Sequence, residues 1–499
     1  ALAESNLPFP VDLHVWDEVP ERFREIIRKE YVAVQEDKQL EIKTSMPGEW
    51  RKRPIGELVE IFDGPHATPA KTQAGPIFLG ISNLAQGRVN LSEAEHLSED
   101  DYVRWTRRVE PRAGDVVFSY ETRLGEAARV PQGLRCCLGR RMGLLRARSG
   151  EIDERFLLYA YLGPQFQETL RARTVPGSTV DRIPLIDMPQ FPMVVPTDLV
   201  EQRAIAHILG TLDDKIELNR RMNETLEAMA RALFKSWFID FDPVRRNTAR
   251  ARNQPSPRPT SHPSPNGRGE GDEGVVEGKA YDHLFPDSFV DSELGEIPKG
   301  WAVGTLADFA SLNAETWSKN TRPDTIKYVD LSNTKWGRID AVTTYLQEDA
   351  PSRAQRVLRP GDTIVGTVRP GNGSYALVSE AGLTGSTGFA VLRPLSKKHT
   401  EFTYLAATAP ENIEALQHLA DGGAYPAVRP EVVSATLTIR PRGEVLALFS
   451  RISEPLLASM AQNERESRSL AALRDTLLPK LISGEQRVKE AKSFLEQRS

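Results

Sequence analysis

The residues of this chain that could do chemistry are polar and basic side chains in predicted loops. The turns ETRLG and VRPGNGS each carry an arginine, Arg123 and Arg369, and Arg140 is followed directly by Arg141. Arginine pairs with guanine and asparagine or glutamine with adenine through two hydrogen bonds, while phosphates accept any well-placed donor. The residue types in these loops are therefore ones that could contact DNA.

The candidate DNA-contacting residues fall in two parts of the chain. They are His66, Thr68, Lys71, Arg123, Arg140, Arg141, Ser178 and Thr179 in the first part, and Lys319, Arg322, Arg369, Asn372, Ser386, Thr387, Tyr425 and Arg429 in the second. For any single arginine, the alternative is a solvated charge or a structural ion pair. Tyr425 could press against DNA or anchor its own turn.

No combination of residues predicts catalysis. His66 has no cysteine, serine or acid at the spacing of a catalytic partner. The DPVR string at Asp242 lacks the second proline and the aromatic ring of an adenine-methyltransferase pocket, and no ATP-binding glycine loop is present. We therefore expect a non-catalytic chain that binds no cofactor or metal. The alternatives are a DNA methyltransferase or nuclease acting alone, and a helical scaffold with no DNA role.

Composition sets the broad class. The 499 residues are 39% hydrophobic and 27% charged, which predicts two or three globular domains. The net charge of −5 argues weakly against DNA binding, so the prediction depends on local arginine clusters. The sequence has no membrane-spanning run or secretion signal, which predicts a cytoplasmic protein. The adjacent Cys136 and Cys137 form neither a disulfide framework nor a spaced zinc motif.

The chain contains an internal repeat. The string FLGISNLAQGRVN (78–90) resembles YVDLSNTKWGRID (328–340) at an offset of 250 residues. Smaller matches follow at an offset of 247: Gly114-Asp115 with Gly361-Asp362, and Arg146 with Arg393. The order of the matches is kept while most side chains differ. One backbone plan with two different surfaces is the simplest explanation.

A long amphipathic pattern follows each copy of the repeat. Apolar residues recur every three or four positions from Ile205 to Trp237 and from Ile452 to Leu481, which predicts two helices, each roughly 50 Å long. Asn219 and Asn463 occupy matching places, either buried where they set the register or exposed where the stripe drifts. An aromatic cluster at the first helix end predicts either core or a partner interface: Phe234, Trp237, Phe238 and Phe241.

These patterns divide the chain into seven parts. They are an N-terminal extension (1–48), a first globular domain (49–197), a central helix (198–242), a flexible linker rich in Pro and Gly (243–290), a second globular domain (291–442), a C-terminal helix (443–488) and a tail (489–499). In the extension, one face of a short helix after Pro20 could carry five apolar residues: Phe23, Ile26, Ile27, Tyr31 and Val34.

Several strings resemble the specificity subunits of type I restriction-modification systems. They are ALFKSWFIDFDP (232–243), DSELGEIPKGW (291–301), VEQRAIAHIL (200–209) and LRDTLLPKLISGEQRV (473–488). The resemblance implies an α+β fold, with two α/β target-recognition domains in a tandem pseudo-twofold repeat separated by two long antiparallel coiled-coil helices. Each domain would read one part of a split DNA site.

The same resemblance implies a division of labour between subunits. Adenine methylation would belong to two modification subunits that bind S-adenosylmethionine. Cleavage would belong to restriction subunits, which are motor nucleases that use ATP and Mg²⁺. This chain would then bind double-stranded DNA and these partners, and no membrane.

Overall fold

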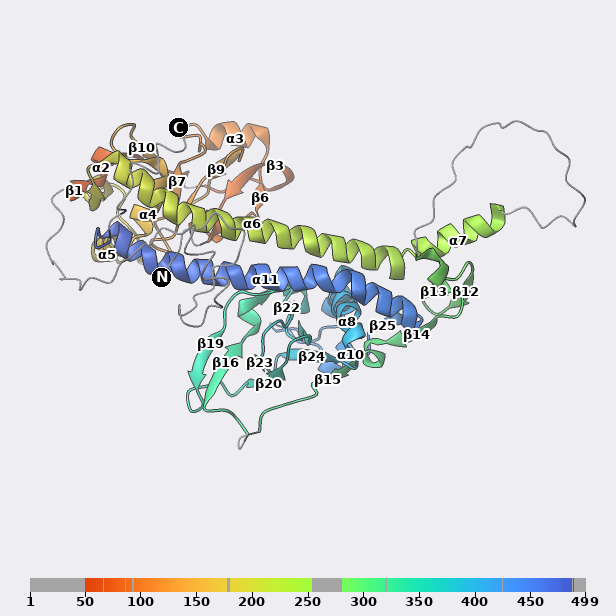
Figure 1. Ribbon diagram of the computed structural model, residues 1–499. Helices are drawn as coiled ribbons and strands as arrows, with labels where there is room; N and C mark the ends of the chain where they lie inside the picture. The colour runs from red at the N-terminus through yellow and green to blue at the C-terminus, as the bar shows by residue number, and fades with distance from the viewer. Residues whose placement is uncertain are drawn as a thin grey trace, which may run out of the picture. The chain divides into compact units, whose positions relative to one another are not determined.

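The computed structural model describes residues 50–65, 67–85, 87–91, 94–176, 180–253, 281–318, 321–423, 425–486 and 488 (Figure 1). The chain forms two compact units. Unit 1 runs to Asn219 and resumes at Arg465, and unit 2 runs from Arg220 to Glu464. Each unit therefore combines one mixed α/β domain with a part of both long helices, α6 (Leu199–Phe238) and α11 (Gly443–Ile482).

The domain of unit 1 is built on small, mostly antiparallel sheets. A four-stranded sheet has the order β2 (Val59–Asp63), β10 (Met142–Ala147), β7 (Val116–Ser119), β8 (Ala127–Arg129), and a three-stranded sheet the order β6 (Glu95–His96), β3 (Thr72–Leu79), β9 (Cys136–Leu138). The remaining strand pairs are β1 (Trp50–Pro54) with β11 (Pro192–Pro196) and β4 (Leu84–Ala85) with β5 (Arg88–Val89). The helices are α2 (Ile55–Leu58), α3 (Glu99–Trp105), α4 (Glu154–Leu162) and α5 (Pro164–Arg173).

The domain of unit 2 repeats this topology with one strand added to its second sheet. Its sheets have the orders β15 (Ala310–Leu312), β24 (Phe389–Pro394), β21 (Thr363–Gly366), β22 (Tyr375–Leu377) and β19 (Thr343–Leu346), β16 (Thr325–Val329), β23 (Leu383–Ser386), β20 (Ala354–Leu358). The pairs are β14 (Ala302–Thr305) with β25 (Leu437–Arg440) and β17 (Thr334–Lys335) with β18 (Arg338–Ile339). The helices are α8 (Thr400–Ala407), α9 (Pro410–His418) and α10 (Pro430–Ser434). The predicted tandem repeat is confirmed.

The aspartate and the arginine that match between the two copies of the repeat form a buried ion pair in each domain. Arg146 Nη2 lies 2.7 Å from Asp115 Oδ2 in unit 1, and Arg393 Nη2 lies 2.9 Å from Asp362 Oδ2 in unit 2. The two aspartates are 5% and 1% exposed. An unpaired charge in such a place is costly, so both partners are needed. These residues therefore hold the fold together in both domains.

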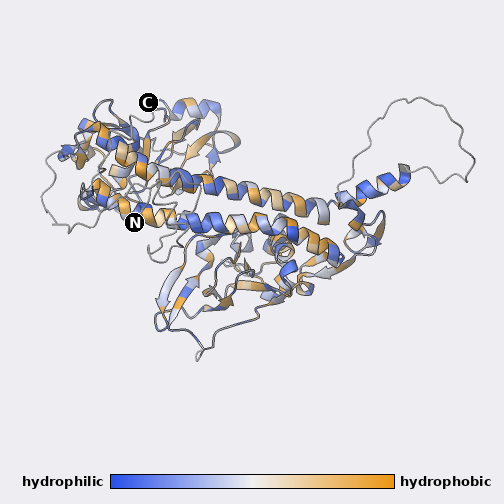
Figure 2. Cartoon of the chain, in the orientation of Figure 1, coloured by the Kyte–Doolittle hydropathy of each residue, from blue (hydrophilic) through white to orange (hydrophobic). Residues whose placement is uncertain are grey.

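The two long helices pack with buried polar residues on their seam, and Figure 2 shows apolar and hydrophilic residues interspersed along both. In unit 1, Asn219 is 1% exposed and its Nδ2 donates to Glu466 Oε2 at 2.8 Å. In unit 2, Asn463 is 8% exposed and its Nδ2 donates to Asn223 Oδ1 at 2.8 Å. Along these contacts, residue numbers rise on α6 while the numbers of the contacting residues fall on α11, so the helices run antiparallel. Of the two interpretations of these asparagines, the structure supports the buried seam.

The aromatic cluster at the end of α6 lies in the core of unit 2. The side chains of Phe234, Trp237, Phe238 and Phe241 are 1% to 8% exposed. Phe238 meets Phe402 at a ring distance of 5.0 Å and Phe449 at 4.9 Å, both edge to face. Of the two interpretations of these residues, core or partner interface, their burial supports the core, because the chain itself already covers their surface.

Part of the predicted linker is ordered structure. Residues 243–253 belong to α7 (Asp242–Asn253), and the strands β12 (Phe289–Ser292) and β13 (Gly295–Pro298) form a hairpin (Figure 1). Asn247 Nδ2 donates to the carbonyl oxygens of Asp282 at 2.7 Å and Phe285 at 2.9 Å, and Arg246 pairs with Asp282 at 2.8 Å. These long-range contacts are not visible in local composition. The predicted N-terminal extension and tail, and residues 254–280, lie outside the described residues.

Candidate nucleic-acid interface

Several loops of unit 2 meet at one edge of its sheets. Thr367 N–H donates to the Gly388 carbonyl and Thr387 N–H to the Arg353 carbonyl, each at 2.8 Å. Ser374 Oγ donates to the Leu331 carbonyl at 3.1 Å. We call the joined loops, residues 330–337, 351–353, 367–374, 386–388, 421–423 and 425–427, the loop edge of unit 2. The edge unites segments that are far apart in the sequence.

The loop edge of unit 2 carries most of the candidates predicted in this domain. Arg369, Asn372 and Tyr425 are exposed there, and Thr387 is half-buried. Ser386 is fully buried, and its Oγ accepts from Gly388 N–H at 3.2 Å, so it shapes the turn instead of facing solvent. Arg429 is exposed at the start of α10.

Arg322 joins the loop edge through the backbone. Its Nη2 donates to the carbonyl oxygens of Ala354 at 2.9 Å and Ser352 at 3.3 Å. The guanidinium therefore fixes the loop before β20. Arg322 thus has a structural role, which was the alternative to a DNA contact. Lys319 lies outside the described residues.

Unit 1 has an equivalent loop edge, formed by residues 79–81, 120–126, 139–141, 175–176 and 180–182. Tyr120 N–H donates to the Arg141 carbonyl at 3.3 Å, as Thr367 does to Gly388 in unit 2. A backbone bridge joins Glu121 to Arg182, as another joins Val368 to Ala427. The two loop edges are therefore built by corresponding hydrogen bonds.

Three candidates of unit 1 lie on its loop edge: Arg123, Arg140 and Arg141. Arg123 and Arg140 are exposed, and Arg141 is half-buried. Arg123 Nη2 pairs with Glu126 and Arg141 Nε with Glu121, each at 2.7 Å. Thr68 and Lys71 are exposed in the segment after β2, where Lys71 pairs with Glu95. His66, Ser178 and Thr179 lie outside the described residues.

Backbone strain concentrates at these edges. Among the described residues, six that are not glycine have a positive φ, and four of them lie in the two loop edges: Thr122 (68°), Arg141 (71°), Trp336 (48°) and Arg369 (48°). Such residues persist only where the surrounding structure holds them, and they cluster at functional sites. The strain marks the same surface as the polar candidates.

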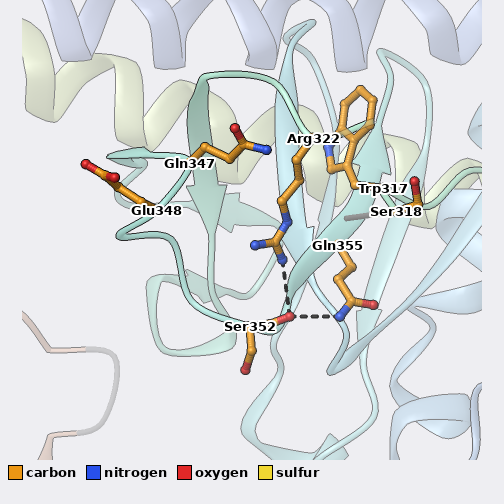
Figure 3. A pocket seen from close by; sticks show the side chains of 7 residues that line it. All are labelled: Trp317, Ser318, Arg322, Gln347, Glu348, Ser352 and Gln355. Carbon is orange, nitrogen blue, oxygen red and sulfur yellow. Dashed lines mark hydrogen bonds between the residues drawn. The ribbon is translucent and has the colours of Figure 1, made fainter. Parts of the chain in front are cut away.

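A shallow pocket opens beside the loop edge of unit 2 (Figure 3). Its lining includes the indole of Trp317 and the amides of Gln347 and Gln355. Trp317 Nε1 donates to Thr384 Oγ1 at 3.0 Å, and Gln355 Nε2 to the Ser352 carbonyl at 2.8 Å. Amides and flat rings are groups that contact base edges and faces. Sequence analysis missed these residues because no local motif connects them.

The exposed Trp336 was also missed. It is 51% exposed, and it stands in the matched repeat where the first copy has Gln86. That substitution of a large ring for an amide, inside an otherwise matched string, was a signal that sequence comparison of the two copies could have used.

Two features of the described residues bear on catalysis: the placement of possible metal ligands and the reactivity of the thiols. No three His, Cys, Asp or Glu among them are placed to hold a metal ion. Burial raises the pKa of both thiols, Cys136 and Cys137, to about 12, which makes them poor nucleophiles. In the same part of the chain, no helix combines the length and the apolar character needed to cross a membrane.

Comparison with known proteins points to one family. The family model for the type I restriction modification DNA specificity domain matches residues 47–228. The specificity subunit of the type I restriction enzyme HindI of Haemophilus influenzae is 27% identical over 350 residues, covering 63% of this chain and 72% of the relative. The MjaIX specificity subunit of Methanocaldococcus jannaschii is 23% identical over 461 residues, covering 89% and 95%.

A solved structure shares the fold. The crystal structure of the type I restriction-modification S subunit from M. genitalium superimposes with a TM-score of 0.50 at 16% identity, covering 89% of this chain and 98% of that one. The domain match, the two specificity-subunit relatives and the repeated architecture agree with one another. Residues 47–228 thus match the DNA specificity domain of type I restriction-modification systems, and the chain is similar over most of its length to specificity subunits of these systems.

Proposed function

We propose that this chain reads a DNA site in two parts, one with each loop edge, and directs adenine methylation and cleavage by partner subunits. The observation that carries the proposal is the repeated topology with diverged loops. Arg140 and Arg141 follow β9 in unit 1, whereas Thr387 and Gly388 follow β23 in unit 2. Side chains at corresponding positions of the two domains differ, so the two domains are suited to read different bases.

The loop edges have the chemistry that base reading requires. Exposed arginines at Arg123, Arg140 and Arg369 can reach guanine or phosphate, and Asn372 can pair with adenine. The net charge of −5 does not oppose this, because many of the acidic residues are engaged with arginines elsewhere, as Asp115 and Asp362 are. Local charge, not the total, determines affinity for DNA.

The catalytic steps are proposed for partner subunits. Two modification subunits would bind S-adenosylmethionine and methylate adenine, and restriction subunits would use ATP and Mg²⁺ to move along and cut DNA. The relatives support this division, since they are named specificity subunits of restriction enzymes. The chain itself would bind no cofactor and would act by placing the methylating subunits on a chosen site.

The test is to coexpress this chain with its modification subunit in a host that lacks adenine methylation. Methylated adenines are then mapped by single-molecule sequencing. The proposal expects one split motif, with two short half-sites around a fixed gap. Absence of methylation from a complex that assembles and binds S-adenosylmethionine would contradict it. Methylation or cutting by the purified chain alone would instead favour an independent enzyme.

A further inference from the structure

We propose that Arg369 is the base-reading side chain of the second recognition domain, that it contacts a guanine, and that Tyr425 is the residue that positions it. The inference rests on the proposed function and names the residues that carry it in unit 2. Three observations support it: the backbone at Arg369, the ring beside its guanidinium, and the loop beneath.

The backbone of Arg369 is held in a conformation that arginine does not favour. Its φ of 48° and ψ of 62° are left-handed, and the next residue, Pro370, restricts it further. Two hydrogen bonds maintain it: Arg369 N–H donates to the Pro426 carbonyl at 2.7 Å, and its own carbonyl accepts from Asn372 N–H at 2.9 Å. Glycine or asparagine would fit here with less strain, so the arginine side chain is the feature that needs explanation.

The guanidinium of Arg369 lies on an aromatic ring. Its central carbon is 4.7 Å from the ring centroid of Tyr425, a residue that is 72% exposed. This contact restricts how the plane of the guanidinium and its edge can be oriented. That edge carries the paired N–H groups that match O6 and N7 of guanine. The contact with Tyr425 therefore preorganises the Arg369 side chain for reading one base.

The loop beneath Arg369 is supported from its other side. Gly373 is also left-handed, with a φ of 67°, and a Cβ atom there would lie 2.6 Å from the Trp336 ring. Trp336 N–H donates to the Gly373 carbonyl at 2.7 Å. The indole thus packs against Gly373, directly after the Pro370–Asn372 turn, and no larger residue fits at Gly373. A turn fixed on both sides keeps the start of the arginine side chain in place.

The first domain has no arginine at the position that corresponds to Arg369. The residue with the corresponding left-handed backbone after β7 is Thr122, with a φ of 68°. Threonine cannot reach a base edge as arginine does. The inference therefore predicts that a change at Arg369 or Tyr425 affects only one half-site, and it leaves the other half-site as an internal control.

The experiment uses the assembled complex with its modification subunit, on duplexes that carry the mapped site or single base-pair replacements. The quantity measured is the ratio of methylation kcat/KM between the mapped site and each replacement. Arg369→Ala is expected to lower this ratio roughly 10- to 100-fold at one G·C pair of one half-site. Tyr425→Ala is expected to lower it about two- to fivefold at the same pair, and Tyr425→Phe to preserve it.

Two further variants separate positioning from direct contact. In the Arg369→Ala background, Tyr425→Ala should have no additional effect, because the ring acts through the arginine. Arg353→Ala removes another exposed arginine of the same loop edge and should weaken methylation of all duplexes alike, as loss of a phosphate contact does. Circular dichroism of each variant confirms folding.

Several outcomes would overturn the inference. A uniform effect of Arg369→Ala, like that of Arg353→Ala, would assign Arg369 to phosphate. An undiminished effect of Tyr425→Ala in the Arg369→Ala background would make the tyrosine an independent contact. Failure of the proposed function is distinguishable, because the wild-type complex would then show no split motif at all.

Discussion

Replacing Asp115 by alanine tests how the recognition domains are held together. In unit 1, the Asp115 carboxylate accepts from Arg146 Nε at 2.9 Å and Nη2 at 2.7 Å, and from the Arg112 backbone N–H at 2.8 Å. Within the described residues, this carboxylate is the one that Arg146 contacts in an ion pair. The variant would leave a largely buried guanidinium without its counter-charge.

The loss in the free energy of unfolding depends on how deeply the ion pair is buried and on which partners the arginine keeps. Breaking a buried pair on one side costs about 3–5 kcal/mol, and the 23% exposure of the Arg146 side chain places Asp115→Ala near the lower value, about 3 kcal/mol. In unit 2, Arg393 keeps Glu315 Oε1 at 2.5 Å after Asp362→Ala. The second variant should therefore cost less, about 2 kcal/mol.

The assay is hydrogen exchange of backbone amides over a series of denaturant concentrations, followed in the strands of each unit. A single melting temperature would not serve, because two units need not unfold together. Asp115→Ala should accelerate exchange in β7 and β10, and Asp362→Ala in β21 and β24.

The control is Glu60→Ala, which removes a pair with Arg148 whose two side chains are nearly half exposed. It should cost less than about 1 kcal/mol. If Asp115→Ala cost no more than this control, or less than Asp362→Ala, the reasoning from burial and residual partners would be refuted.

Two other predictions concern the helices and a buried acid. If α6 and α11 determine the unread gap of the DNA site, duplicating one heptad in both lengthens each by about 10 Å and should widen the mapped gap by about three base pairs; an unchanged gap would contradict it. Burial raises the pKa of Glu401, so the free energy of unfolding should fall as pH rises from the ordinary carboxyl range through that raised value. Glu401→Gln should remove this dependence in denaturation series at several pH values, and an unchanged slope would assign it to other groups.

The fold was largely predictable because its signals are periodic. The apolar spacing from Ile205 to Trp237 predicted α6, which the structure places at Leu199–Phe238. The matched Gly-Asp and Arg residues predicted a shared plan, but not the ion pair, because Asp115 and Arg146 meet only after the strands between them have paired. Pairing of that kind depends on topology and not on neighbours in the sequence.

The candidate interface was predictable only in part. Composition alone cannot show that Ser386 turns inward or that Arg322 is bound to backbone carbonyls, since both depend on distant segments. Nor could it place Trp317 and Gln355 in one pocket. The arginine of VRPGNGS was predicted as a contact from loop chemistry, whereas its left-handed backbone and its ring partner required the structure.

The clamp around Asp282 has a practical consequence. Arg246 and Arg250 both pair with this carboxylate, whose side chain is 4% exposed, and Asn247 holds the backbone next to it. Asn253 and Tyr281, between which the chain is not described, thus both belong to one small substructure that these contacts hold together. A sequence inserted between these two residues would begin and end on a substructure that its own hydrogen bonds and ion pairs hold together. This position is therefore suited to the insertion of a fluorescent reporter or an affinity tag into the protein.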